Sequence, residues 1–160
     1  MSLDQLARAW DLLQEAYKHQ MEGEYELAVD LYKQSIETYP TAEAYTFLGW
    51  TYHFQGKTDD AIGECKKAIQ LDPDFGNPYN DIGAYLIEKG DLEEAITWLE
   101  QAITSKRYES YHYPYYNLGR VFLAKDMLNK ARECFEKALE ICPSYTLAGE
   151  ALQKLRRKVM

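Results

Sequence analysis

The sequence predicts an all-α solenoid in which short helices stack in pairs along the 160 residues of the chain. The first observation is a repeat, because Gly49, Gly83 and Gly119 each follow a large apolar residue, at intervals of 34 and 36 residues. The second is helical spacing, since apolar residues recur every three or four positions on both sides of Gly90. One helix pair cannot bury its apolar stripe alone, so several pairs must stack on one another.

The first pair is expected over residues 3–40. Ser2 and Gln5 have the spacing of a capping box, which opens the first helix of this pair. Pro40 follows the last apolar residue of the second helix, where a missing N–H ends a helix at little cost. The small and aromatic residues of this pair follow the later repeats, with a less regular first helix: Ala16, Gly23, Ala28, Tyr32 and Ser35.

Three further pairs are expected over residues 41–74, 75–109 and 112–143, followed by a capping helix over residues 144–158. The second helices of these pairs carry alanines seven residues apart: Ala61 and Ala68, Ala95 and Ala102, Ala131 and Ala138. Such small residues allow neighbouring helices to approach closely. All four pairs and the last helix then form one domain.

The turns inside the pairs are marked by glycine. Gly23, Gly56 and Gly90 fall between the paired helices, where a permissive backbone is needed. Asp126 has this place in the fourth pair. We therefore expect a less compact or differently closed turn there.

The charge distribution argues against nucleic acid as a partner. The formal charge is −8, and residues 1–74 account for all of it, with 6 basic and 14 acidic side chains. Binding to phosphates would require clustered Lys and Arg instead. The acidic first half favours a solvated surface that keeps the protein soluble, with a basic partner segment as the alternative.

Neither the cysteines nor the apolar runs indicate a cofactor or a membrane span. Cys65, Cys134 and Cys142 lie among apolar helix positions without paired spacing, which favours buried thiols in a reducing compartment over a metal or redox role. No run approaches the roughly twenty apolar residues of a membrane span, and no signal-peptide pattern opens the chain. We expect a cytoplasmic protein without cofactor or metal, unless native flanking segments have been cut away.

The repeat resembles the tetratricopeptide repeat (TPR) over nearly the whole chain. Leu71-Asp72-Pro73 also resembles the usual junction between repeats of that family. The resemblance implies a right-handed superhelix in which the first helix of each pair lines a concave groove. Family members mostly hold peptides or helices of other proteins in this groove, as scaffolds, co-chaperones and assembly factors.

If the first helices face inward as in the family, aromatic and amide side chains would line the groove. Aromatic residues provide large contact areas at low entropic cost, and an asparagine amide can match the donors and acceptor of a peptide backbone. Family members that hold extended peptides often use an asparagine in the place of Asn117. The predicted ligand face consists of Trp50, Phe54, Asn80, Tyr113, Tyr116, Asn117 and Arg120.

The sequence departs from the TPR subgroup that grips chaperone tails. That subgroup holds a C-terminal carboxylate with Lys, Asn, Asn, Lys and Arg. The nearest equivalent places here are occupied by Leu13, Tyr17, Phe47, Asn77 and Asp81. Because two cations are missing, a carboxylate would find little to pair with, and we do not expect binding of chaperone tails.

Two extra residues lengthen the junction between the third and fourth pairs, over residues 106–116, and this segment is rich in tyrosine. Its tyrosines either form an aromatic lip at the groove or brace a longer loop, and the sequence leaves both open. The insertion should also change the local superhelical twist.

The predicted function is that of a non-enzymatic protein-interaction module. Phosphate loops, zinc-ligand pairs and nucleophile turns are missing from the sequence, and His19, His53 and His112 fall in different helix pairs. The alternatives are self-association and a chaperone-type assembly or secretion role. An enzyme is the least favoured class, since no catalytic constellation is present.

Overall fold

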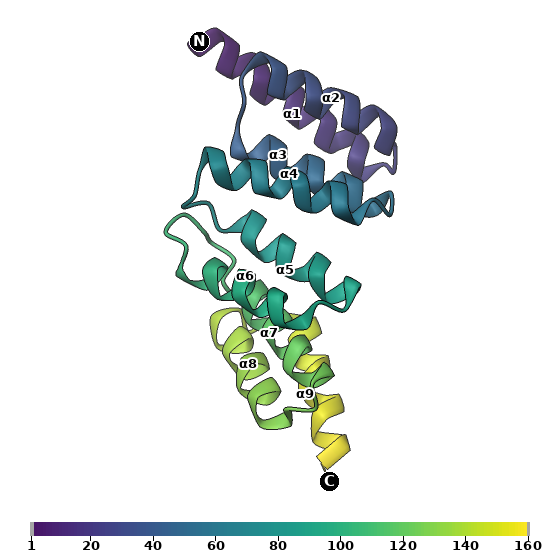
Figure 1. The fold of residues 1–160 in the computed structure, drawn as a ribbon, viewed down its shortest axis with the longest axis vertical. Coiled ribbons are helices and arrows are strands. Elements are labelled where there is room, and N and C mark those ends of the chain that lie inside the picture. Colours follow the sequence, from purple (N-terminus) through teal and green to yellow (C-terminus); the bar gives the residue numbers. More distant parts are fainter. Residues whose placement is uncertain (1, 160) are drawn as a thin grey trace.

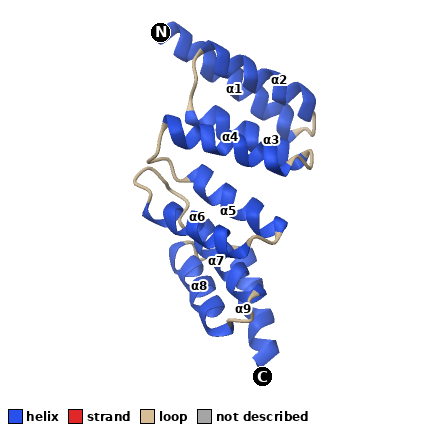
Figure 2. Ribbon diagram, in the orientation of Figure 1, coloured by secondary structure: helices blue, strands red, loops and turns tan. Residues whose placement is uncertain are grey.

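A computed structural model describes residues 2–159, and this part of the chain forms nine α-helices and one isolated β-bridge (Figures 1 and 2). The predicted all-α solenoid is confirmed. The helices, in order, are α1 (Leu3–Met21), α2 (Tyr25–Thr38), α3 (Ala42–Phe54), α4 (Thr58–Leu71), α5 (Asn77–Lys89), α6 (Leu92–Thr104), α7 (His112–Ala124), α8 (Leu128–Ile141) and α9 (Thr146–Val159).

The helices stack in chain order from one end of an elongated molecule to the other (Figure 1). The most extensive contacts lie within four pairs, α1 with α2, α3 with α4, α5 with α6 and α7 with α8. The first helices also contact each other in succession, α1 with α3, α3 with α5 and α5 with α7. This row of first helices forms the inner layer of the solenoid. Within residues 2–159 no helix combines the length and apolar character needed to cross a bilayer.

In the third and fourth pairs, a glycine of the first helix packs against a large side chain of the second helix. A Cβ on Gly83 would lie 2.5 Å from Cγ of Leu99, and a Cβ on Gly119 would lie 2.4 Å from Cε1 of Phe135. Leu99 and Phe135 are fully buried. Close approach at these positions is what lets the two helices of a pair pack without a gap.

The turns inside the pairs share one conformation. Gly23, Gly56 and Gly90 have φ angles of 80°, 79° and 86°, in the left-handed region that glycine tolerates. Asp126 adopts the same conformation with φ 60°, and the hydrogen bond from Met127 N to Phe122 O, 2.8 Å, corresponds to the one that closes each glycine turn. The expectation of a differently closed fourth turn was wrong, because aspartate is among the few residues that enter the left-handed region.

Polar contacts fix the first pair at its start and in its interior. The capping box predicted at Ser2 and Gln5 is present, with Gln5 N donating to Ser2 Oγ at 3.2 Å. Deeper in the pair, the hydroxyl of Ser35 donates to the carbonyl of Ala9 at 2.7 Å. At the other end of the chain, α9 buries an apolar stripe of Ala148, Leu152 and Leu155.

Candidate binding groove

A cavity of about 490 Å³ lies over the inner layer, between α3, α5 and the segment that joins α6 to α7. Six of the eleven lining residues are aromatic, and two carboxylates, two amides and one threonine complete the wall. The lining residues are Tyr17, Glu43, Thr46, Phe47, Trp50, Phe75, Asn77, Asn80, Asp81, Tyr108 and Tyr113. Three residues of the predicted ligand face, Trp50, Asn80 and Tyr113, therefore meet in one cavity.

A chain of three polar side chains links α5 to α7. Nδ2 of Asn117 donates to Oδ1 of Asn80 at 2.9 Å, and Nη1 of Arg120 donates to Oδ1 of Asn117 at 3.0 Å. Asn80 and Asn117 are 8% and 7% exposed. Asn117 thus uses both ends of its amide inside the protein and positions its two neighbours. The oxygen of Asn80 is also engaged, and its side chain interacts with the neighbouring carboxyl of Asp81.

Asp81 lines the cavity with a carboxyl group that is partly exposed to it. Burial raises the pKa of this carboxyl to about 7, and the side chain of Asn80 opposes the shift. Within residues 2–159 no Lys or Arg forms an ion pair with Asp81. The cavity therefore contains a carboxyl group that protein packing pushes toward its neutral form.

Of the other aromatic residues of the predicted face, Phe54 and Tyr116 are not among the residues that line the cavity. Phe54 is 47% exposed, packs 4.9 Å from the ring of Trp50 and stacks on Tyr25. Tyr113, which lines the cavity, is 42% exposed. Tyr116 instead contacts Tyr145, with ring centroids 5.3 Å apart, and lines a separate hollow against α9.

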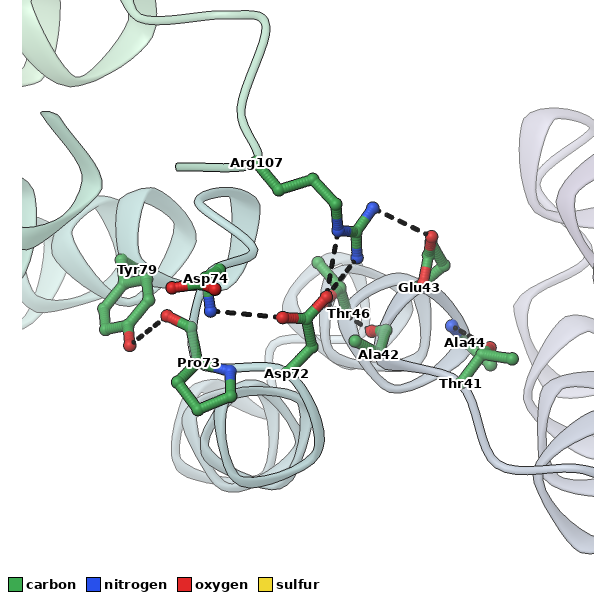
Figure 3. A network of polar contacts seen from close by, with 10 residues as sticks. All are labelled: Thr41, Ala42, Glu43, Ala44, Thr46, Asp72, Pro73, Asp74, Tyr79 and Arg107. Carbon is green, nitrogen blue, oxygen red and sulfur yellow. Dashed lines mark hydrogen bonds and ion pairs between the residues drawn. The ribbon is translucent and has the colours of Figure 1, made fainter. Parts of the chain in front are cut away.

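A network at the rim of the cavity was not predicted from the sequence. The guanidinium of Arg107 reaches back from the α6–α7 segment and lies between Asp72 and Glu43 (Figure 3). Its Nη2 is 2.8 Å from Oδ2 of Asp72, its Nη1 is 3.2 Å from Oε2 of Glu43, and its Cζ lies 4.1 Å from the ring centroid of Phe75. One side chain thus joins the start of α3, the end of α4 and the loop before α5 to the α6–α7 segment.

The backbone of the inserted segment follows the same path. Arg107 N donates to Asp74 O at 2.9 Å, and Gly76 N donates to Arg107 O at 3.1 Å. Tyr108 covers Gly76 so closely that a Cβ there would lie 2.5 Å from Cγ of the tyrosine. The inserted segment therefore braces the loop between α4 and α5, and Tyr108 and Tyr113 also add to the wall of the cavity. Both interpretations of the insertion describe part of it.

Five positions of this chain correspond to the residues with which the chaperone-tail subgroup holds a carboxylate. One of them lies in the core and four line the cavity. Leu13 is 6% exposed and belongs to the core between α1, α2 and α3, so this position does not face the groove. Because α2 and α3 both pack on α1, fewer residues of α1 face the groove than helical spacing alone predicts. The remaining four residues, Tyr17, Phe47, Asn77 and Asp81, line the cavity.

The histidines lie apart. His53 stacks on Tyr85 with ring centroids 4.8 Å apart, and its Nδ1 is 3.4 Å from Oε2 of Glu88. In the α1–α2 turn, His19, Glu22 and Glu24 bring three ligand-type atoms within 4.8 Å of one another. The hydrogen bond from His19 lowers the pKa of Glu24, and this contact accounts for their proximity.

Comparison with known proteins identifies the repeat. Three models described as tetratricopeptide repeat match residues 9–43, 42–75 and 74–144 in succession. The chain belongs to the tetratricopeptide repeat family. The TPR matches span α1 to α8, and the inner layer of first helices is thus the concave side of a TPR solenoid.

Two curated relatives and one solved structure illustrate the likeness. The small glutamine-rich tetratricopeptide repeat-containing protein 2 of Mycosarcoma maydis is 30% identical over 62% of this chain and 29% of its own length. The protein SGT1 homolog of Oryza sativa subsp. japonica is 35% identical over 59% of this chain and 26% of its own length. Pseudomonas aeruginosa pilF has a similar structure, with a TM-score of 0.87 and 25% identity over 96% of this chain and 70% of that one. The chain matches less than a third of either curated relative.

Proposed function

We propose that this TPR protein is a non-enzymatic interaction module that binds a peptide or helix of another protein along the groove of α3, α5 and α7. The observation that carries the proposal is the aromatic cavity over the inner layer, because exposed aromatic rings in a concave site are typical of binding hot spots. Trp50, Asn80 and Tyr113 are expected to touch the ligand. Asn117 and Arg120 are expected to hold Asn80 in place.

A ligand of this type should bind with micromolar affinity, roughly −8 kcal/mol. Phe54 extends the aromatic surface beyond Trp50, and Tyr116 would be reached only by a ligand that continues toward α9. Truncation of Asn117 to alanine should weaken binding by about 1 kcal/mol, because it frees Asn80 and Arg120 from their hydrogen bonds.

The experiment is affinity capture from a lysate of the source organism with a Trp50→Ala/Tyr113→Ala double variant. The matched control is Trp98→Ala, which removes an aromatic side chain from α6, in the outer row of second helices. Circular dichroism checks that helicity is unchanged. Partners that the wild type and the control retain, but the double variant loses, support the groove. Recovery of the same partners by all three proteins would contradict it.

Self-association is the second candidate, because Leu147 on α9 is 49% exposed beside the hollow that holds Tyr116. Light scattering at increasing concentration tests this alternative. A mass that rises with concentration in the wild type and stays constant in a Leu147→Glu variant would favour assembly through α9. A chaperone-type role would be a narrower form of the first proposal.

A further inference from the structure

We infer that the cavity beside Asp81 receives a lysine or arginine side chain of the bound protein segment. This inference rests on the proposed groove function and adds the chemistry of the ligand. The reasons are the composition of the cavity wall, an arginine of the same chain that already occupies similar surroundings, and a carboxyl group that forms no ion pair with a Lys or Arg of residues 2–159.

The wall of the cavity suits a cation with an apolar stem. Six of its residues are aromatic, and the faces of such rings attract lysine and arginine. The aliphatic part of a long basic side chain packs on apolar surface while its charged end reaches a polar group. Glu43 and Asp81 place two carboxyl groups in the wall, and no Lys or Arg is among the lining residues. An acidic ligand would meet only like charge from these two side chains.

Arg107 shows how this surface holds a cation of the chain itself. Its guanidinium lies over the ring of Phe75 and is flanked by Asp72 and Glu43, at the rim of the same cavity. Phe75 and Glu43 are also lining residues. Because Arg107 already compensates Glu43, the carboxyl that remains for a ligand is Asp81.

The surroundings of Asp81 explain why a cation would matter there. Asn80 offers N–H donors from α5, whereas the Cys65 thiol and the Tyr85 and Tyr108 hydroxyls stand close enough to feel its charge. Burial chiefly, and the Asp81 charge in addition, raises the pKa of each of these three groups, so they stay neutral near pH 7. A ligand cation would favour ionised Asp81, whose pKa in the free protein is about 7. Binding should therefore strengthen as the pH rises from 6 to 8.

The test uses a phage-displayed library of random dodecapeptides, panned at pH 8 against the wild-type protein. Selected peptides are synthesised, and their affinities are measured by fluorescence anisotropy for wild type, Asp81→Asn and Trp50→Ala. Glu100→Gln is the matched control, since Glu100 is an exposed residue of α6 away from the cavity. A second peptide of each kind carries norleucine in place of the basic residue.

We expect the selected peptides to share one Lys or Arg position. Replacing that residue with norleucine should weaken binding about tenfold, as should Asp81→Asn, and the two changes together should cost no more than either alone. Glu100→Gln should bind like the wild type.

Two other results are distinguishable. Peptides that depend on Trp50 but bind wild type and Asp81→Asn equally would overturn the inference and leave the groove function standing. Peptides that depend on neither residue, or a library that yields no binder, would overturn both.

Discussion

The contacts inside a helix pair and the contacts at the junction between the third and fourth pairs stabilise the molecule in different ways. Inside a pair, Gly83 lies against Leu99 and Gly119 against Phe135, with no space for a methyl group. At the junction, Arg107 forms partly exposed polar contacts with Asp72 and Glu43, which lie 35 and 64 positions earlier in the chain. Tight apolar packing allows few changes, whereas exposed ion pairs contribute little and tolerate substitution.

The difference matters for the groove. The packing inside the pairs sets the positions of the first helices, and hence the shape of the concave side. The junction adds Tyr108 and Arg107 to one particular part of that side, at the rim of the cavity. The common repeat thus provides the scaffold, and the irregular segment provides what is individual to this chain.

The largest expected effect separates two glycines that both lie inside helices. Gly83→Ala would place a Cβ 2.5 Å from Leu99, whereas nothing lies within 4 Å of a Cβ at Gly63. Gly83→Ala should lower the free energy of unfolding by about 1–3 kcal/mol through overpacking. Gly63→Ala should raise it by about 0.5–1 kcal/mol, because alanine favours the helix. Urea unfolding followed by circular dichroism measures both. Equal effects of the two changes would show that the space beside Gly83 is not limiting.

The next effect concerns the carboxyl group of Asp81, which lines the cavity together with Tyr108 of the α6–α7 segment. The Asp81 pKa is about 7 in the folded protein and near 4 in the unfolded chain. As the pH rises, the unfolded state therefore loses this proton at a lower pH than the folded state does. The protonated carboxyl contributes stability that is fully present below pH 4 and is lost as the pH rises through 7. Asp81→Asn should remove this loss, worth about 2 kcal/mol at pH 8 after allowance for the part of the group open to the cavity.

The measurement is the difference in unfolding free energy between wild type and Asp81→Asn at pH 5, 6, 7 and 8. The other ionisable groups are common to both proteins, so their contributions cancel in this difference. Glu100→Gln again serves as the control, for which the difference should stay flat. A flat difference for Asp81→Asn as well would mean that its carboxyl is solvated like a surface group.

Much of the fold could be predicted because the repeat records contacts between neighbours in the chain. Gly83 and Leu99 are sixteen residues apart, and the same relation recurs at Gly119 and Phe135. The turn at Asp126 was misjudged because a single substitution says little about φ when aspartate can adopt the same conformation as glycine.

The site was less predictable, since it depends on contacts between distant segments. Helical spacing cannot separate Leu13 from Tyr17, which share one face of α1; the approach of the neighbouring helices buries the first and leaves the second on the cavity. The contact of Tyr108 with Gly76 depends on the path of the inserted segment. The two extra residues in that segment indicated that this junction is unusual, but they do not indicate the direction in which the segment runs.

The smallest expected effect tests whether the junction is an independent element. Arg107→Ala removes the contacts with Asp72, Glu43 and Phe75 and should lower the free energy of unfolding by about 1 kcal/mol, more than a single exposed ion pair. Arg132→Ala is the control, because the ion pair of Arg132 with Glu136, at 3.5 Å, is exposed. This substitution should change stability by at most about 0.5 kcal/mol.

Hydrogen exchange locates the effect of Arg107→Ala. The amides of Gly76 and Arg107 form the hydrogen bonds between the α4–α5 loop and the α6–α7 segment, and they should exchange faster in the variant. The amide of Gly83 inside α5 should keep its protection. If Gly83 also loses protection, the junction and the packing of the third pair form one cooperative unit. The irregular segment would then be part of the scaffold and not an addition to it.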